Sequence, residues 1–167
     1  VFIWNKINEW KRRRVAEEDN DEDRIEDRMN VSDVSIDLDD EPLEIVKSFC
    51  YLGDVTGSCG GCSDAITARL RSAWKNFCDL LPILTDRAIS LQGIGYAYSS
   101  CIRSVMLYAC QTWATNVEDV NRLKRNEYAM LRWICHVRIV DRISTEELRR
   151  RLSLKPLEDV IRWARLR

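Results

Sequence analysis

Residues 49–74, FCYLGDVTGSCGGCSDAITARLRSAW, decide how this chain is built. An apolar, aromatic run leads into four glycines between positions 53 and 61, and that density of glycine is typical of a tight, irregular turn. A helical period follows, because Ile66, Leu70 and Ala73 recur at spacings of three and four. The stretch therefore predicts a strand, a turn and the start of a helix.

Helices are predicted over most of the remaining chain. Ser63 is a candidate N-cap for the first helix, and Pro82 is expected to end it. The second is apolar nearly all round, with Arg103 as its only charge, which suits a central, mostly buried helix. The others are expected to begin near Asn116, at a capping box on Ser144, and near Pro156. The second and last of these helices are expected over 91–113 and 157–167.

A small β-hairpin is predicted before the helices. Alternating apolar residues over 34–38, a turn at 39–42 and an apolar run over 45–52 favour two paired strands. The chain is thus expected to be mainly α, with a hairpin followed by a helical bundle. The expected segments are a short helix (1–14), an acidic linker (15–32), a hairpin with its glycine turn (33–62) and the bundle (63–167).

Charge is divided unevenly along the chain. Residues 1–14 have five basic and one acidic side chain, a net of +4; residues 15–44 have two and fourteen, a net of −12; residues 45–167 have nineteen and twelve, a net of +7. Segment 15–32 has too few apolar residues to offset the entropy of ordering it, so it is expected to be disordered. The basic bundle points to an acidic partner.

Metal and redox sites are poorly supported. Cys59 and Cys62 have the spacing of a zinc knuckle, but a structural site needs four ligands and no second close pair occurs. The seven cysteines are irregularly spaced and favour buried thiols in a reducing, intracellular compartment, either nucleus or cytoplasm. No apolar run has the length of a membrane span, and the absence of an initiator Met or leader predicts a piece of a longer protein.

Catalytic patterns are also weak. Asp39 and Asp40 follow an apolar strand, as metal-binding aspartates do in polymerases, but no third carboxylate is identifiable and Pro42 turns the chain at once. His136 is expected to be a partly buried histidine at a helix end, without the acid and nucleophile of a triad. These residues predict no catalytic site and no bound metal.

Basic side chains on successive helices form the strongest functional signal. The first predicted helix carries Arg69, Arg71 and Lys75, and the third carries Arg122, Lys124 and Arg125, with Arg149 to Arg151 further on. Clusters of this kind can follow a phosphate backbone, although basic side chains on exposed helix faces are more often simply solvated. Nonspecific binding of nucleic acid is the function they indicate.

Seven short segments carry a further signal through their order and spacing. They are SFCYLGD (48–54), GGC (60–62), AITAR (65–69), SAW (72–74), CIRSVMLY (101–108), TW (112–113) and MLRWIC (130–135). With these segments the chain resembles the C-terminal part of reverse transcriptases from non-LTR (LINE-like) retrotransposons. The resemblance extends from about Ile36 to the chain end and departs from the family at Ala109 and Gln111, where a glycine and an acid are usual.

The resemblance implies a place in a larger polymerase. It implies that Phe49, Tyr51, Leu52 and Gly53 steady the primer end and that the helices form a thumb along an RNA/DNA template-primer duplex. The catalytic aspartates and their Mg²⁺ would belong to an upstream palm domain, a second expected partner. The chain itself would then be non-catalytic and would hold no cofactor.

A different class of function stays open. The chain could be a degenerate retrotransposon relic that acts only as a helical protein-interaction or structural module, with its acidic segment folded over the basic face. Salt-dependent binding of an RNA–DNA hybrid separates the two interpretations.

Overall fold

A computed structural model describes residues 37–38, 41–42, 48–51, 54–57 and 62–166. The chain divides into two units, 1–45 and 46–167. In the first unit, β1 (Asp37–Leu38) and β2 (Glu41–Pro42) pair antiparallel. The predicted helix over 1–14 and the acidic linker over 15–32 lie outside the described residues.

The second unit begins with a hairpin of β3 (Ser48–Tyr51) and β4 (Asp54–Gly57), in which Cys50 lies opposite Val55. The prediction that residues 45–52 pair with residues 34–38 is therefore wrong, and part of the predicted glycine turn is strand. Two residues join β3 to β4, and one of them is glycine, the preferred residue of two-residue hairpin turns. Closing this two-residue loop costs less entropy than closing the longer loop of the predicted pairing between residues 34–38 and 45–52.

The long helix α2 (Ser63–Leu84) follows the hairpin. Its buried side chains recur at helical spacing along one stripe, and its N-terminal end packs against β4. Cys62, not Ser63, occupies the N-cap position, without a side-chain cap. Pro82 was expected to end the helix, but the helix continues for two residues, because Pro82 lies in the last turn on the exposed side.

The second predicted helix is shorter than expected and not uniform. It consists of α3 (Leu91–Tyr98), a π-helical turn η1 (Ser99–Arg103) and α4 (Ser104–Met106). Ser90 caps it by accepting a hydrogen bond from the Gly93 N–H, 3.2 Å away. The predicted extension to Trp113 is wrong: the chain leaves the helix in successive turns, and Ala109 has a φ of 60°, in the left-handed region.

The three remaining predicted helices are confirmed. They are α5 (Val117–Ile134), α6 (Thr145–Arg151) and α7 (Leu157–Arg165), with a short 3₁₀ turn η2 (Ile139–Asp141) before α6. Asn116 and Asp119 form a complete capping box at the start of α5. At α6, Ser144 accepts the Glu147 N–H as predicted, but the Glu147 carboxylate binds Arg150 and Arg151.

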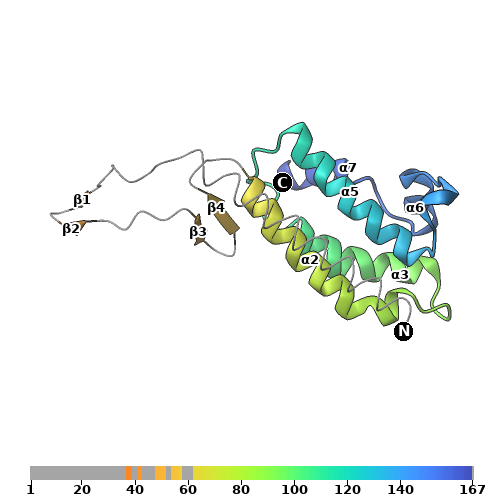
Figure 1. Cartoon of the computed structure of the whole chain (residues 1–167). Helices are drawn as coiled ribbons and strands as arrows, with labels where there is room; N and C mark the ends of the chain where they lie inside the picture. The colour runs from red at the N-terminus through yellow and green to blue at the C-terminus, as the bar shows by residue number, and fades with distance from the viewer. Residues whose placement is uncertain (1–36, 39–40, 43–47, 52–53, 58–61, 167) are drawn as a thin grey trace. The chain divides into compact units, whose positions relative to one another are not determined.

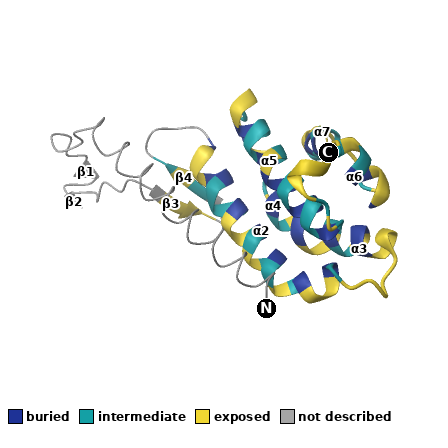
Figure 2. Ribbon diagram, turned by 45° about the vertical axis from the view of Figure 1, so that its right-hand side comes forward, coloured by how far each residue is buried: buried dark blue, intermediate teal, exposed yellow. Residues whose placement is uncertain are grey.

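Helix α2 packs against α5 and against the segment of α3, η1 and α4, and the core lies among these helices (Figure 1). In Figure 2 their buried residues form stripes, while exposed residues cover the outer surface. Large side chains such as Tyr98, Phe77 and Leu131 are fully buried, and each contributes roughly 1.5–3 kcal/mol by leaving water. The predicted fold class, mainly α with a small hairpin before the helices, is confirmed. Among the described residues, no helix combines the length and apolar character needed to cross a bilayer.

Candidate nucleic-acid interface

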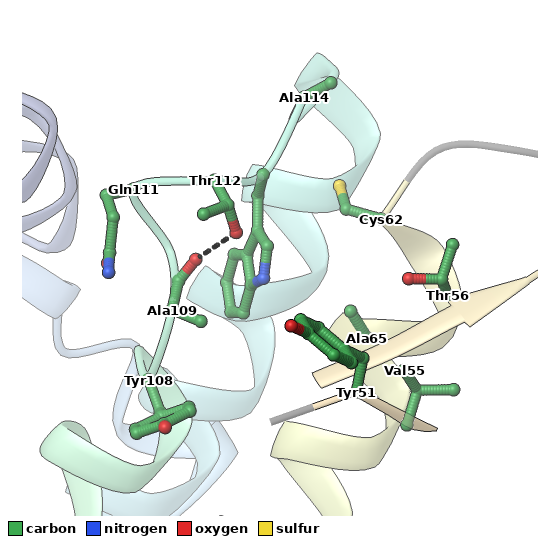
Figure 3. A pocket seen from close by; sticks show the side chains of 11 residues that line it. Tyr51, Val55, Thr56, Cys62, Ala65, Tyr108, Ala109, Gln111, Thr112 and Ala114 are labelled. Carbon is green, nitrogen blue, oxygen red and sulfur yellow. Dashed lines mark hydrogen bonds between the residues drawn. The ribbon is translucent and has the colours of Figure 1, made fainter. Parts of the chain in front are cut away.

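A cleft of about 800 Å³ separates the β3–β4 hairpin from the segment that joins α4 to α5. In Figure 3, Tyr51, Val55 and Thr56 line one side, and Tyr108, Ala109, Gln111 and Thr112 line the other. Cys62, Ala65, Trp113 and Ala114 complete the lining. One wall of the cleft thus includes Tyr51 of the predicted primer-gripping strand, and the opposite wall is the segment between α4 and α5.

Two aromatic rings stand on the outer strand of this hairpin. Phe49 and Tyr51 are two positions apart on β3, so their side chains point to the same face. Their ring centroids are 6.5 Å apart with an interplanar angle of 21°, and the two residues are 59% and 65% exposed. Exposed, nearly parallel rings form a platform on which another flat group can stack. Leu52 and Gly53, also predicted to contact the primer, lie outside the described residues.

An arginine and an aromatic ring meet beside the cleft. The guanidinium carbon of Arg69 lies 4.3 Å from the centroid of the Tyr108 ring, within the range of a cation–π interaction. Tyr108 is half exposed and lines the cleft. Of the predicted cations, Arg69 is thus the one that comes next to the cleft, through a contact with the segment after α4.

The Cys62 thiol in the wall of the cleft is expected to be unreactive. The Cys62 thiol donates a hydrogen bond to Asp119 Oδ2, 3.4 Å away. Burial, reinforced by the Asp119 carboxylate, raises the pKa of Cys62 to about 11. A thiol that keeps its proton is a poor nucleophile and a poor metal ligand. The Trp113 Nε1 is buried without a hydrogen-bond partner in the described part of the chain.

The cations of α2 divide between two sides of the helix. Arg69 and Arg71 are two positions apart, which places them roughly 200° apart around the axis. Arg71 and Lys75 are four positions apart and share an exposed side. The structure therefore brings Arg71 and Lys75 together and separates them from Arg69.

The cations of α5 point in different directions, and two of them are paired. Arg122 and Lys124 are again roughly 200° apart around their helix. Lys124 forms an ion pair with Glu158 of α7, and Arg125 Nη2 lies 2.6 Å from Glu118 Oε1. The three do not share one side of α5, and two of them already bind carboxylates.

The arginines of α6 are also occupied. Arg150 and Arg151 both donate to Glu147, at 2.8 and 3.0 Å, and these hydrogen bonds lower the pKa of Glu147 to about 2. Arg149 points inward and is 8% exposed. These side chains are less available to a phosphate backbone than their positions in the sequence predict.

Sequence reasoning missed a buried ionic cluster, which we call the Arg103–Glu127–Arg149 triad. Glu127 is completely buried on α5; its Oε1 accepts from Arg103 Nε at 3.0 Å, and its Oε2 accepts from Arg149 Nε and Nη2 at 3.0 and 2.7 Å. The triad ties η1, α5 and α6 together. The signal in the sequence was Arg103, the single charged residue of an otherwise apolar predicted helix. An arginine buried in such a helix requires an acidic partner.

No ligand set for a metal comes together within the described ranges: no three His, Cys, Asp or Glu side chains converge. Cys59, the other cysteine of the knuckle spacing, lies outside those ranges. His136 is exposed rather than partly buried, because the chain turns there with a φ of 53° after α5 ends. The sequence matches no protein-family model, and comparisons with curated proteins and with solved structures find no similar protein.

Proposed function

We propose that this chain is a non-catalytic part of a reverse transcriptase of the non-LTR retrotransposon class and holds nucleic acid for it. The observation that carries the proposal is the pair of exposed, stacked rings of Phe49 and Tyr51, of which Tyr51 lines the cleft. Both are residues to which the resemblance assigns contact with the primer end.

Aromatic stacking supports contact with unpaired bases. Proteins that bind single strands stack bases on exposed aromatic side chains beside a positively charged groove. Tyr51 and Tyr108 line the same cleft, and Arg69 lies over the second ring. Arginine over an aromatic ring keeps a positive charge next to a flat surface, which suits a base and its phosphate.

Charge supports a contribution from the outer side of α2. Lys75 is exposed and has no ion-pair partner within the described part of the chain, and Arg71 lies one turn away on the same side. Each phosphate neutralised by such a side chain adds affinity that falls as salt rises. On α5 and α6, Lys124, Arg125 and Arg150 already bind carboxylates.

Fluorescence anisotropy with a labelled RNA–DNA hybrid that carries a single-stranded overhang tests the aromatic part. Tyr51→Ala is expected to weaken binding by about 1–3 kcal/mol, the usual cost of losing one stacking partner. Trp163→Ala is the matched control, because Trp163 is 64% exposed on α7 and does not line the cleft. Equal affinities for the two variants would remove the aromatic platform from the proposal.

A salt titration of the same hybrid tests the electrostatic part. Combining Arg71→Glu with Lys75→Glu is expected to weaken binding and to flatten its dependence on salt. Arg87→Glu is the control, since Arg87 is also exposed and lies beyond the end of α2. If the wild-type chain fails to bind the hybrid at low salt, the proposed function is wrong.

One observation favours the alternative of a protein-interaction module. Val117, Trp163 and Leu166 are large apolar residues with exposures of 79%, 64% and 73%. A contiguous apolar patch can mark a contact surface, and Trp163 and Leu166, three positions apart, lie on one side of the C-terminal end of α7. Sedimentation over a range of concentrations distinguishes the alternatives: self-association that Trp163→Ala abolishes, without hybrid binding, supports the interaction module.

A further inference from the structure

A second pocket, of about 490 Å³, lies where α3 and η1 meet the turn between α6 and α7. Its polar and charged lining residues are Gln92, Tyr96, Ser99, Arg103, Ser153 and Lys155. Two of these residues are basic and none is acidic.

The buried basic residue of this wall, Arg103, belongs to a cluster with surplus positive charge. Arg103 is 3% exposed and shares the single carboxylate of Glu127 with Arg149. Two guanidiniums and one carboxylate leave a formal charge of +1 in the protein interior. The nearby Lys124–Glu158 ion pair is neutral as a whole and does not change this balance. An anion at the pocket would offset a charge that water reaches poorly.

The rim adds a second charge and hydroxyl donors. Lys155 is exposed and has no carboxylate partner in the part of the chain that the structure describes. The Ser153 backbone is held in the left-handed region, with a φ of 53°, by the hydrogen bond from its N–H to the Arg150 carbonyl at 3.2 Å. Lys155, the hydroxyls of Ser99 and Ser153 and the Gln92 amide thus line the same pocket as Arg103.

We propose that this pocket binds a phosphoryl group. A terminal phosphate carries a charge between −1 and −2 and three strong acceptor oxygens, which suits the two positive charges and the several donors of the wall. The pocket is built from residues that the aromatic cleft does not use, so phosphate binding there can be tested separately from the proposed function. The phosphoryl group could belong to a nucleic acid strand or be free phosphate.

The test measures inorganic phosphate binding from the thermal unfolding midpoint, in millimolar phosphate against chloride at equal ionic strength. We expect phosphate to raise the wild-type midpoint, since a ligand of the folded state stabilises it. Lys155→Ala should weaken phosphate binding by roughly tenfold, the loss of one charge-assisted hydrogen bond. Ser153→Gly, which suits the left-handed backbone, should also weaken it.

Arg87→Ala is the control, because Arg87 is an exposed cation beyond the end of α2 that lines neither this pocket nor the cleft. It should keep the wild-type response. A wild-type midpoint that is the same in both salts, or equal responses in Lys155→Ala and Arg87→Ala, would overturn the proposal. Tyr51→Ala, which tests the hybrid binding proposed above, should leave the response to phosphate unchanged.

Competition identifies the source of the phosphoryl group. An oligonucleotide with a 5′-phosphate and the same oligonucleotide with a 5′-hydroxyl compete against inorganic phosphate. Displacement by the first alone assigns the site to a strand end, and displacement by both assigns it to internal phosphodiesters. If neither displaces phosphate from a site that depends on Lys155, the ligand is free phosphate.

Discussion

A Cβ atom on Gly95 would lie 1.9 Å from the carbonyl oxygen of Leu152. Helix α3 therefore approaches the end of α6 so closely that only glycine fits. Gly95→Ala is expected to lower the free energy of unfolding by about 1–3 kcal/mol, because the obstacle is backbone and one element must shift. Urea denaturation followed by circular dichroism measures the change.

Gly93→Ala is the matched control for this close approach. Gly93 lies on the same helix, but its nearest neighbours are the side chains of Ser90 and Ile89, at 3.2 and 3.4 Å. The better helix propensity of alanine offsets these contacts, so the change should stay within about 1 kcal/mol. If both variants lose the same stability, the contact with Leu152 does not constrain the fold.

Loss of the charge on Glu127 is expected to be among the most destabilising single changes. Glu127→Gln leaves two buried guanidiniums without a carboxylate, and breaking a buried ion pair in this way costs about 3–5 kcal/mol. Chemical denaturation gives the free energy of unfolding, and near-ultraviolet circular dichroism shows whether α5 and α6 still pack.

Glu118→Gln provides the comparison for Glu127→Gln. Glu118 lies on the same helix and also binds an arginine, but its side chain is 69% exposed and that of Arg125 is 65% exposed. Exposed pairs are worth about 0–1 kcal/mol. Comparable losses in the two variants would show that burial does not strengthen the dependence on Glu127.

The helices were predictable because their signals are local. Apolar periodicity located α2 and α5, Pro156 marked the start of α7, and Asn116 and Ser144 stand at helix starts, where their side chains form caps. Strand pairing was not predictable in the same way: the run at 48–51 could pair with either neighbour, and the alternation of side chains does not identify the partner.

The candidate sites were less predictable, because they depend on contacts between distant positions. The sequence places Arg69 and Arg71 side by side, but helix geometry turns them to different sides, and Arg69 meets Tyr108. Arg149 looks like part of an exposed basic run until the fold buries it against Glu127. Charge counted along the chain does not reveal which cations already have partners.

The rate of alkylation should differ between exposed and buried cysteines. Cys50 and Cys101 are exposed and are expected to react quickly with iodoacetamide, whereas Cys62 and Cys110 are buried. Burial raises the pKa of Cys110 as well as that of Cys62, so few of these thiols are ionised at neutral pH. Mass spectrometry of a time course locates the modified residues. The chain unfolded in urea gives the reference rate for each cysteine. If exposed and buried cysteines react at equal rates in the folded chain, the described burial is wrong.

The free energy of unfolding should fall at alkaline pH as the Cys62 thiol loses its proton. Its pKa is about 11 in the folded chain, against an ordinary value of 9.0, so the folded state binds this proton more tightly than the unfolded state does. The resulting stabilisation is fully present below pH 9 and is lost as the pH rises from about 9 to about 11.

Other groups titrate in the same range, so the measurement is the difference in free energy of unfolding between wild type and Cys62→Ser under reducing conditions. The wild-type advantage should shrink between about pH 9 and about pH 11, because serine has no proton to lose there. A difference for Cys62→Ser that stays flat over this range would mean that burial and the Asp119 carboxylate do not retain the proton.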